Sequence, residues 1–254
     1  MAYITFQDKK LYYERMGDGP PLLLLHGNTA SSNMFYEIAP AFKDAYEVIL
    51  IDFLGHGRSD RLAAFPADLW FYEAEQVIAL IEALALGSVN LIGSSGGALV
   101  AINVALEAPA LVRKVIADSF EGKSAMTAFT ENIAADRALS KNSAQDRQFY
   151  EYMHGADWES VVDLDTAAIA AHGSSIGNFF HKPLSALQAP ILFTGSKEDE
   201  FTALFSPDYF AETYGEMIGE IGHGEMYLFP TGGHPALLSN ATAFTEISKT
   251  FLAE

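Results

Sequence analysis

The chain contains a serine enclosed by glycines at a spacing that suits nucleophilic chemistry. Residues 93–97, Gly-Ser-Ser-Gly-Gly, match the pattern G-x-S-x-G with Ser95 at the centre. An apolar run, Val89 to Ile92, comes before it, and a helical pattern, Ala98 to Glu107, comes after. A sharp strand-to-helix turn exposes the serine hydroxyl, and small neighbours let the flanking chains approach closely. The pattern therefore predicts Ser95 as a nucleophile.

The same spacing occurs a second time, at residues 173–177, with Ser175 at the centre. The residues before it, Ala167 to His172, carry a helical or loop pattern and no apolar run typical of a buried strand. A turn that exposes a nucleophile needs such a strand before the serine. We therefore exclude Ser175 and retain Ser95.

A serine hydroxyl needs a base, and histidine is the side chain that titrates closest to neutral pH. Among seven histidines, His234 follows the last predicted strand, Glu225 to Phe229, across two glycines that let the loop reach the sheet edge. His26 and His56 lie in glycine-containing turns, where we expect them to form hydrogen bonds within the loops. The other four are expected in packing, surface or substrate-contact roles: His154, His172, His181 and His223. The pattern favours His234 as the base.

Short apolar runs bounded by turn signals predict the strands that position these residues. They are Leu22–Leu25, Val48–Ile51, Val89–Ile92, Val112–Ala117, Ile191–Thr194 and Tyr227–Phe229. Two alternating segments, Tyr3–Phe6 and Leu11–Arg15, predict an N-terminal hairpin. Helical spacing at Glu73–Leu86, Ala98–Glu107 and Pro235–Leu252 separates the strands. This alternation predicts an α/β fold with a mostly parallel central sheet and helices on both faces.

One interval, residues 121–183, interrupts this alternation with helical, polar sequence that has no strand candidate. Connections in βα units usually take about 2–6 residues, so this interval is an insertion with structure of its own. We interpret it as a helical cap, or lid, over the carboxyl edge of the sheet, where open α/β sheets bind ligands. Residues 1–120 and 184–254 then form the core.

Four segments resemble motifs of one family and occur in that family's order. The turn His26–Asn28 resembles an oxyanion loop, and Asp52–Asp60 resembles the pattern D-x-x-G-x-G-x-S. Residues 93–97 form the serine turn, and Gly232–Pro235 resemble a catalytic-histidine turn. Over nearly its whole length the chain resembles the α/β-hydrolase superfamily, in the serine-nucleophile branch with a helical cap. The family often has an arginine where Leu54 stands, which concerns loop packing and leaves the chemistry untouched.

The resemblance implies a carboxylate that holds the histidine tautomer and stabilises its cation. Three candidates follow the predicted strand Ile191–Thr194: Glu198, Asp199 and Glu200. The family usually has an aspartate three or four residues past the glycine that follows this strand. Asp199 fits by type and Glu198 by the shorter spacing, so we favour Asp199 and expect Glu200 to be solvated. Asp118, at the end of another predicted strand, is an acid position used in some hydrolases.

An acyl-transfer site also needs two donors for the developing oxyanion. The best candidates are the backbone N–H groups of Gly96, at the start of a helix, and of Asn28, in the loop that resembles the oxyanion loop. Three residues beside these motifs are expected to contact the substrate: His26, Ser94 and Phe120. Ser94 is also expected to pack or to form hydrogen bonds locally.

Composition narrows the classes of partner. Half of the 254 residues are hydrophobic and 19% are charged, which is typical of a folded protein with a substantial core. The net charge is −18 and the basic residues form no cluster, so we expect no nucleic-acid partner. No apolar run approaches the ~20 residues of a membrane helix, and we expect a cytoplasmic protein with no membrane partner. The lack of cysteine excludes disulfides, thiolate zinc sites and cysteine nucleophiles.

These patterns predict an enzyme and its substrate class. A serine at the turn excludes the aspartate-nucleophile chemistry of the family's dehalogenases and epoxide hydrolases. Aromatic residues in the 121–183 insertion either line an apolar pocket or pack the cap onto the sheet. We predict a carboxylesterase for uncharged small or medium acyl esters, acting through an acyl-enzyme that requires neither metal nor cofactor. The alternatives are a carbon–carbon bond hydrolase or cofactor-free peroxidase with the same triad, and a non-enzymatic ligand receptor on this fold.

Overall fold

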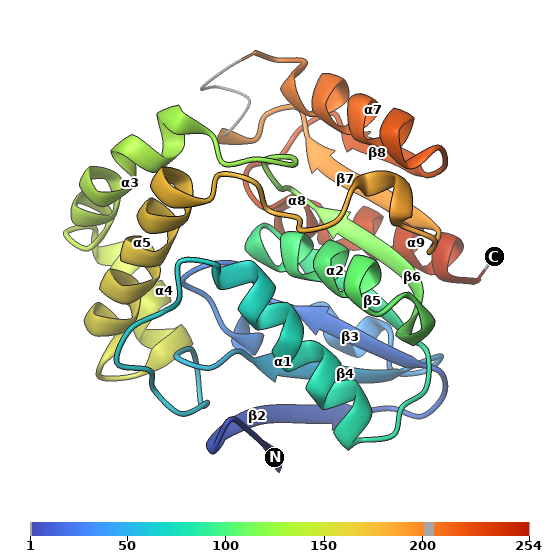
Figure 1. Cartoon of the computed structure of the whole chain (residues 1–254), viewed down its shortest axis with the longest axis horizontal. Helices are drawn as coiled ribbons and strands as arrows, with labels where there is room; N and C mark the ends of the chain where they lie inside the picture. Colours follow the sequence, from blue (N-terminus) through green and yellow to red (C-terminus); the bar gives the residue numbers. More distant parts are fainter. Residues whose placement is uncertain (1, 201–205, 254) are drawn as a thin grey trace.

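A computed structural model describes residues 2–200 and 206–253, and an eight-stranded sheet runs through its middle (Figure 1). The strand order is β1-β2-β4-β3-β5-β6-β7-β8. The strands are β1 (Ala2–Phe6), β2 (Lys9–Met16), β3 (Pro21–Leu25), β4 (Glu47–Asp52), β5 (Val89–Ser94), β6 (Val112–Asp118), β7 (Ile191–Ser196) and β8 (Glu225–Phe229). Two neighbouring pairs of this sheet are antiparallel, β1 with β2 and β2 with β4, and its other five pairs are parallel. The predicted α/β fold with a mostly parallel sheet is confirmed.

Helices cover both faces of this sheet. One face carries α1 (Leu69–Ala83), α2 (Gly96–Glu107) and α7 (Tyr209–Ile221), and the other carries α9 (Ala241–Ala253) after the short α8 (Ala236–Ser239). Short 3-10 turns in the described connections lie at Ser32–Phe35, Ala39–Ala41, Pro109–Leu111 and Leu184–Ala186. None of the helices within the described ranges combines the length and the apolar composition needed to cross a bilayer.

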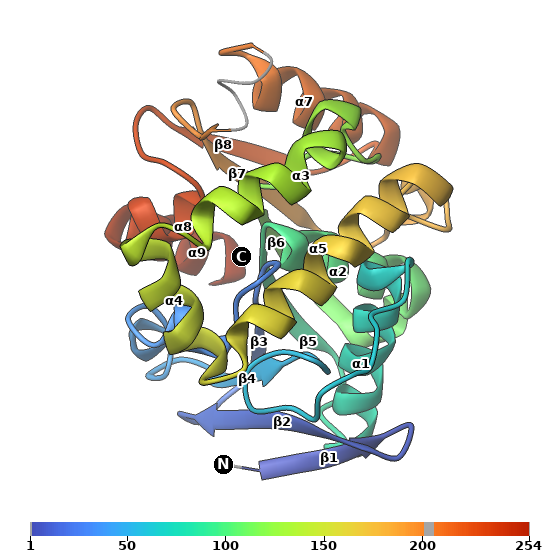
Figure 2. The ribbon, with the colours of Figure 1, turned by 90° about the vertical axis from the view of Figure 1, so that its left-hand side faces the viewer.

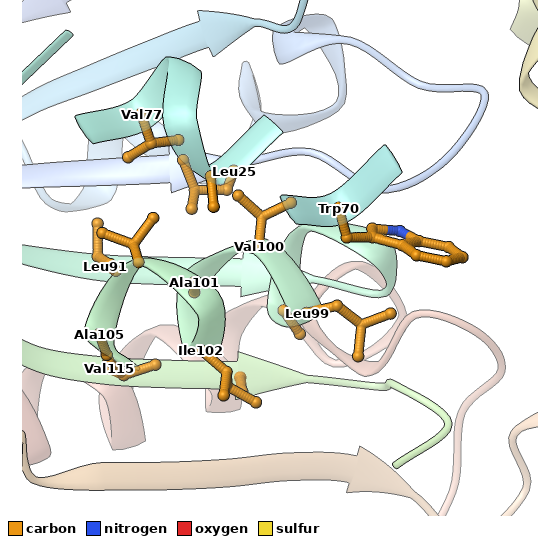
Figure 3. Close-up of a cluster of buried hydrophobic side chains, with 14 of the residues drawn as sticks. Leu25, Trp70, Val77, Leu91, Leu99, Val100, Ala101, Ile102, Ala105 and Val115 are labelled. Atoms are coloured by element: carbon orange, nitrogen blue, oxygen red, sulfur yellow. The ribbon is translucent and has the colours of Figure 1, made fainter. Parts of the chain in front are cut away.

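The leucine run of β3 shows why the sheet is buried on both faces. Because successive strand residues point to opposite sides, Leu23 and Leu25 pack with α1 and α2, while Leu22 and Leu24 pack with α9. Helix α2 is buried along nearly its whole length and lies directly on β5 and β6. Figure 3 shows residues of α2, among them Val100, gathered with side chains of the sheet and of α1. This packing fixes the position of the turn between β5 and α2.

The observed helices depart from the predicted ones at several places, of which the following are the largest. Helix α1 begins at Leu69, four residues before the predicted start at Glu73. The predicted helix Pro235–Leu252 is divided at Asn240 into α8 and α9. Helix α7 was not predicted, although its buried residues recur at helical spacing: Phe210, Tyr214, Met217 and Ile221.

Between β6 and β7 the chain forms three helices, α3 (Thr127–Ser140), α4 (Ala144–His154) and α5 (Trp158–Ser175). Figure 2 shows them together on one side of the molecule, and in Figure 1 this side lies beyond the carboxyl ends of the central strands. An isolated bridge between Ser124 and Asn178 joins the two ends of this helical insertion. Ile133 and Ile169 of the insertion belong to the same apolar cluster as α1 and α2. The division of the chain at residues 121 and 183 stays a prediction.

Candidate active site

Ser95 lies on a strained turn between β5 and α2. Its backbone φ is 54° and its ψ is −122°, a conformation that non-glycine residues rarely adopt and that the surroundings must enforce. Its N–H donates to the carbonyl of Asp118 over 2.7 Å, and its carbonyl accepts from the N–H of Ala98 over 2.9 Å. The turn is therefore fixed from the neighbouring strand and from the first turn of the helix.

The glycines of this turn are required by close backbone contacts. A Cβ on Gly93 would lie 2.1 Å from the carbonyl oxygen of Gly97, and one on Gly97 would lie 2.1 Å from that of Leu25. A Cβ on Gly96 would lie 2.2 Å from Oδ1 of Asn28. Backbone atoms cannot move aside at this density, so the pattern reflects packing as well as chemistry.

Ser175, the centre of the second matching segment, has a different setting. It is the last residue of α5, and its hydroxyl donates to the carbonyl of Ala171 over 2.6 Å on the exposed surface. No strand precedes it, as the sequence context predicted.

His234 and Asp199 meet across two loops at the carboxyl edge of the sheet. Nδ1 of His234 lies 2.9 Å from Oδ2 of Asp199, whose side chain is fully buried, whereas the imidazole is 25% exposed. Because a carboxylate only accepts, Nδ1 is the donor in this bond. The lone pair of the neutral ring is then on Nε2, where it can accept a proton.

The other candidate acids have different partners. Glu198 accepts from the N–H of Gly232 over 3.3 Å, and Asp118 accepts from the hydroxyl of Thr194 over 2.7 Å and from the N–H of Leu237 over 3.0 Å. Burial raises the pKa of the Asp118 carboxyl to about 7. Of the candidate carboxylates considered from the sequence, Asp199 is the one hydrogen-bonded to the ring of His234.

Glu200 is exposed, as expected, and it also has a structural contact that the sequence did not indicate. Its carboxylate accepts from the backbone N–H of His234 over 2.8 Å, and the residue lines the cavity described below. The loop that carries His234 folds back onto the loop of residues 197–200, so two consecutive carboxylates of the second loop bond to His234. The side chain of Asp199 holds the ring, while that of Glu200 holds the backbone.

A cavity of about 640 Å³ lies between the sheet edge and the helical insertion. From the core it is lined by the proposed nucleophile, base and oxyanion donors: Ser95, His234, Asn28 and Gly96. From the insertion it is lined by side chains that include Phe129, Ile133, Tyr150 and Ile169. No hydrogen bond joins Ser95 Oγ to His234 among the described residues, and such contacts often tighten only when substrate binds.

Two of the three residues expected to contact substrate line this cavity, and one does not. Ser94 and Phe120 are lining residues, and Oγ of Ser94 is enclosed with no hydrogen-bond partner in the described part of the chain. The assignment of His26 to substrate binding is wrong. His26 is buried, its Nδ1 donates to the carbonyl of Gly27, and its Nε2 accepts from the N–H of Phe53 over 3.1 Å. Both ring nitrogens are used to shape the loop.

The proposed oxyanion donors face each other across this loop. The side chain of Asn28 packs over Gly96, as the Cβ contact above shows. Within residues 2–200 and 206–253, neither the N–H of Asn28 nor that of Gly96 donates a hydrogen bond to the protein. Two unused N–H groups beside Ser95 are the arrangement that stabilises a developing oxyanion.

The cavity is acidic and contains a buried carboxyl that sequence reasoning missed. Its acidic lining residues are Glu121, Asp136, Asp146 and Glu200, and Arg137 is the basic side chain beside them. Glu121 is 7% exposed, and its Oε2 has no hydrogen-bond partner within the described ranges. Burial raises the pKa of the Glu121 carboxyl to about 8, so it is mostly neutral at pH 7. No three His, Asp or Glu side chains of the described residues are arranged as ligands of one metal ion.

A second buried pair, His56 and Asp165, lies beneath the loop of residues 26–29. Nε2 of His56 lies 3.0 Å from Oδ2 of Asp165, and both side chains are fully buried. Asp165 comes from α5, 109 residues along the chain from His56, and no local pattern marks it. Sequence reasoning therefore missed it.

Comparison with known proteins places the chain among hydrolases. Over 261 residues it is 25% identical to serine hydrolase BPHL of Mus musculus, covering 99% of this chain and 86% of that protein. It is also 25% identical to the 2-hydroxy-6-oxo-6-phenylhexa-2,4-dienoate hydrolase of Comamonas testosteroni, covering 97% and 92%. An esterase structure from Exiguobacterium antarcticum superposes with a TM-score of 0.77 at 21% identity, covering 97% and 96%.

The family model for the alpha/beta hydrolase fold matches residues 20–153, which is more than half of the chain and contains the loop of residues 26–29 and the serine turn. The strand order, the strained serine turn and the histidine loop at the sheet edge agree with this match. The chain belongs to the alpha/beta hydrolase family.

Proposed function

We propose that the protein is a serine hydrolase in which Ser95 is the nucleophile, His234 the base and Asp199 the acid. The observation that carries this proposal is the 2.9 Å bond between His234 and buried Asp199, with His234 and Ser95 lining one cavity. The bond fixes the tautomer whose lone pair is on Nε2, the atom that takes the proton in a base beside a serine.

The proposed reaction has two balanced steps. Oγ of Ser95 attacks the substrate carbonyl carbon while Nε2 of His234 takes its proton, and the N–H groups of Asn28 and Gly96 stabilise the oxyanion. His234 then protonates the departing alcohol, leaving an acyl group on Ser95. A water molecule, deprotonated by His234, then attacks the carbonyl carbon of this acyl group. The bond to Oγ breaks as His234 returns the proton to Oγ, and the acid is released.

We propose uncharged esters of small or medium acyl groups as the substrates. A cavity of about 640 Å³ is within the range that small-molecule sites occupy, and much of its lining is apolar. Four carboxyl groups line the cavity against Arg137, and those of Asp136, Asp146 and Glu200 oppose the entry of an anionic substrate. Burial keeps one of these carboxyls, Glu121, mostly neutral, so it can donate a hydrogen bond to a neutral substrate.

Carbon–carbon bond hydrolysis is the second candidate, and the relative from Comamonas testosteroni favours it. The substrate named for that enzyme contains no ester linkage, so its hydrolysis must break a bond between carbon atoms. That substrate is also a carboxylate. In this chain the one guanidinium among the described cavity residues, that of Arg137, would have to bind it.

A substrate panel tests the proposal. Nitrophenyl esters of increasing acyl length are assayed beside an anionic dienoate, with wild-type protein and with Ser95→Ala. We expect turnover of short and medium esters and none by the variant. Turnover of the dienoate in preference to every ester would establish the second candidate. Equal ester turnover by wild type and Ser95→Ala would overturn the proposal.

A further inference from the structure

The loop beside the proposed nucleophile contains a strained threonine. Residues 26–29, which we call the oxyanion loop, pass so close to the serine turn that a Cβ on Gly27 would lie 3.0 Å from that of Ser95. The last residue of the loop, Thr29, has a φ of 54° and is buried. A β-branched residue in the left-handed region is strained, and it stays there only when its surroundings hold it.

The contacts that hold Thr29 come from the helical insertion. Its N–H donates to Oδ2 of Asp165, on α5, over 3.0 Å, and its carbonyl accepts from Nε2 of His154, on α4, over 2.9 Å. The N–H of Gly57 donates to Nδ1 of His154 over 3.1 Å, which makes Nε2 the donor of that ring. The strained peptide is therefore clamped on both sides by residues more than 120 positions away.

Asp165 also holds the neighbouring asparagine. Nδ2 of Asn28 lies 3.2 Å from Oδ2 and 3.4 Å from Oδ1 of Asp165, while its Oδ1 accepts from Nε1 of Trp70 over 3.1 Å. The side chain of Asn28 is thus fixed at both ends. The backbone N–H of the same residue is the one left without an acceptor in the described part of the chain.

The donors around Asp165 keep it ionised despite full burial. Burial alone would raise its pKa, but the hydrogen bond and charge of His56 and the N–H of Thr29 hold the pKa of the Asp165 carboxyl below its ordinary value. An ionised acceptor makes stronger hydrogen bonds than a neutral one. The carboxylate is therefore a firm anchor for the oxyanion loop.

We propose that Asp165 is a positioning residue that holds the oxyanion loop in place and so directs the N–H of Asn28 toward the carbonyl attacked by Ser95. The inference rests on the proposed function. Because Asp165 is carried by α5, the oxyanion hole is complete only when the helical insertion is docked on the core. The insertion then takes part in catalysis as well as in lining the cavity.

Kinetics and hydrogen exchange on three variants test this inference. Asp165→Ala removes the anchor, whereas Asp165→Asn keeps one acceptor oxygen. Asp163→Asn is the matched control, since Asp163 lies on the same helix, is exposed and pairs with Lys141 at the surface. Each variant is first shown to be folded by circular dichroism and a thermal melt. The readouts are kcat and KM for a nitrophenyl ester and amide exchange over residues 27–30.

We expect Asp165→Ala to lower kcat about 10- to 100-fold with little change in KM, since a misplaced oxyanion donor weakens the transition state more than the ground state. Asp165→Asn should recover part of that loss, and Asp163→Asn should match wild type. Amide exchange at Thr29 should accelerate in the Asp165 variants alone. These results would support the inference.

Two results would overturn it. One is a folded Asp165→Ala protein whose kcat stays within threefold of wild type, or whose change is confined to KM. The other is unchanged exchange at residues 27–30. Wild-type protein with no ester turnover would instead refute the proposed function, and the exchange measurement would still decide whether Asp165 holds the loop.

Discussion

Two His–Asp pairs lie near the same cavity and have nearly the same length, 2.9 Å for His234–Asp199 and 3.0 Å for His56–Asp165. In each, a fully buried carboxylate accepts from an imidazole. The imidazoles differ in what surrounds them. His234 is 25% exposed and lines the cavity, whereas His56 is fully enclosed between the rings of His26, Phe65 and His154.

Under the proposed function, access to the cavity, rather than pairing with a carboxylate, separates the base His234 from the structural His56. A base must reach a substrate proton, and His56 is fully buried and is not among the described residues that line the cavity. Its bond to Asp165 instead ties α5 to the loop that carries His56, and the same carboxylate accepts from the N–H of Thr29 in the oxyanion loop. In the proposed function, a His–Asp pair therefore serves proton transfer where the ring lines the cavity and a structural role where the ring is enclosed by protein.

The sharpest test of the comparison replaces each histidine with alanine. We expect His234→Ala to lower kcat about 10⁴-fold or more with little loss of stability, because its ring is partly exposed and its role is chemical. His56→Ala removes the imidazole partner of the buried Asp165 carboxylate and should cost about 3–5 kcal/mol of unfolding free energy. Ester kinetics and urea unfolding measure the two effects. A stability loss at His234 larger than at His56 would contradict the comparison.

The next largest effect is expected from the acid of the exposed pair. Asp199→Asn keeps the shape but not the tautomer control, so kcat should fall about 10³- to 10⁴-fold. Glu198→Gln is the control, because its carboxylate bonds to the backbone of Gly232 and not to the ring. We expect it to stay within about tenfold of wild type. If the two variants ranked in the opposite order, Glu198 would be the acid.

A third buried carboxyl, that of Glu121, shows how hydrogen-bond donors affect the pKa of a buried acid. Hydrogen-bond donors lower the pKa of the buried Asp165 carboxyl. For the Glu121 carboxyl, whose Oε2 has no hydrogen-bond partner among the described residues, burial raises the pKa from 4.5 to about 8. Between these two pH values the unfolded chain has lost the Glu121 proton and the folded chain has kept it. Folding stability therefore falls as pH rises through this window.

Glu121→Gln should remove that dependence. Relative to wild type, the variant should gain stability from pH 5 to pH 8, by an amount on the order of 4 kcal/mol at about 1.4 kcal/mol per pKa unit. Thermal melts across this range measure it, with Asp136→Asn, an exposed carboxyl of the same cavity, as control. A constant difference between Glu121→Gln and wild type at every pH would show that Glu121 is ionised in the folded protein.

The smallest effect is expected at the second serine. Ser175 lies at the exposed end of α5 and bonds to its own helix, so Ser175→Ala should change ester turnover by less than about twofold. An uncharged organophosphonate should still add once, at Ser95, as mass spectrometry of the labelled peptide would show. Labelling at Ser175 in the wild type would overturn the choice between the two segments.

The sequence was most informative where a local pattern is also a packing requirement. Glycines at 93 and 97 are demanded by backbone contacts of about 2 Å, so the strand–turn–helix around Ser95 could be predicted from residues close together in the chain. The alternation of strands and helices could be predicted because strands that are buried on both faces of the sheet appear in the sequence as short apolar runs. Helix α7 shows that a periodic pattern was also present where no helix was expected.

By itself, then, the sequence determined the fold class, the serine turn and the order of the candidate residues, because these depend on short-range spacing and on which faces must be buried. Only the tertiary structure decided that Asp199 meets His234 and that the ring of His26 holds a loop instead of lining the cavity. It also decided that Asp165 bonds to the oxyanion loop and that a buried carboxyl, Glu121, lines the cavity. The physical reason is that hydrogen bonds and desolvation are set by neighbours in space. Asn28 and Asp165 are 137 positions apart in the chain, and the sequence around neither residue indicates that the two side chains meet.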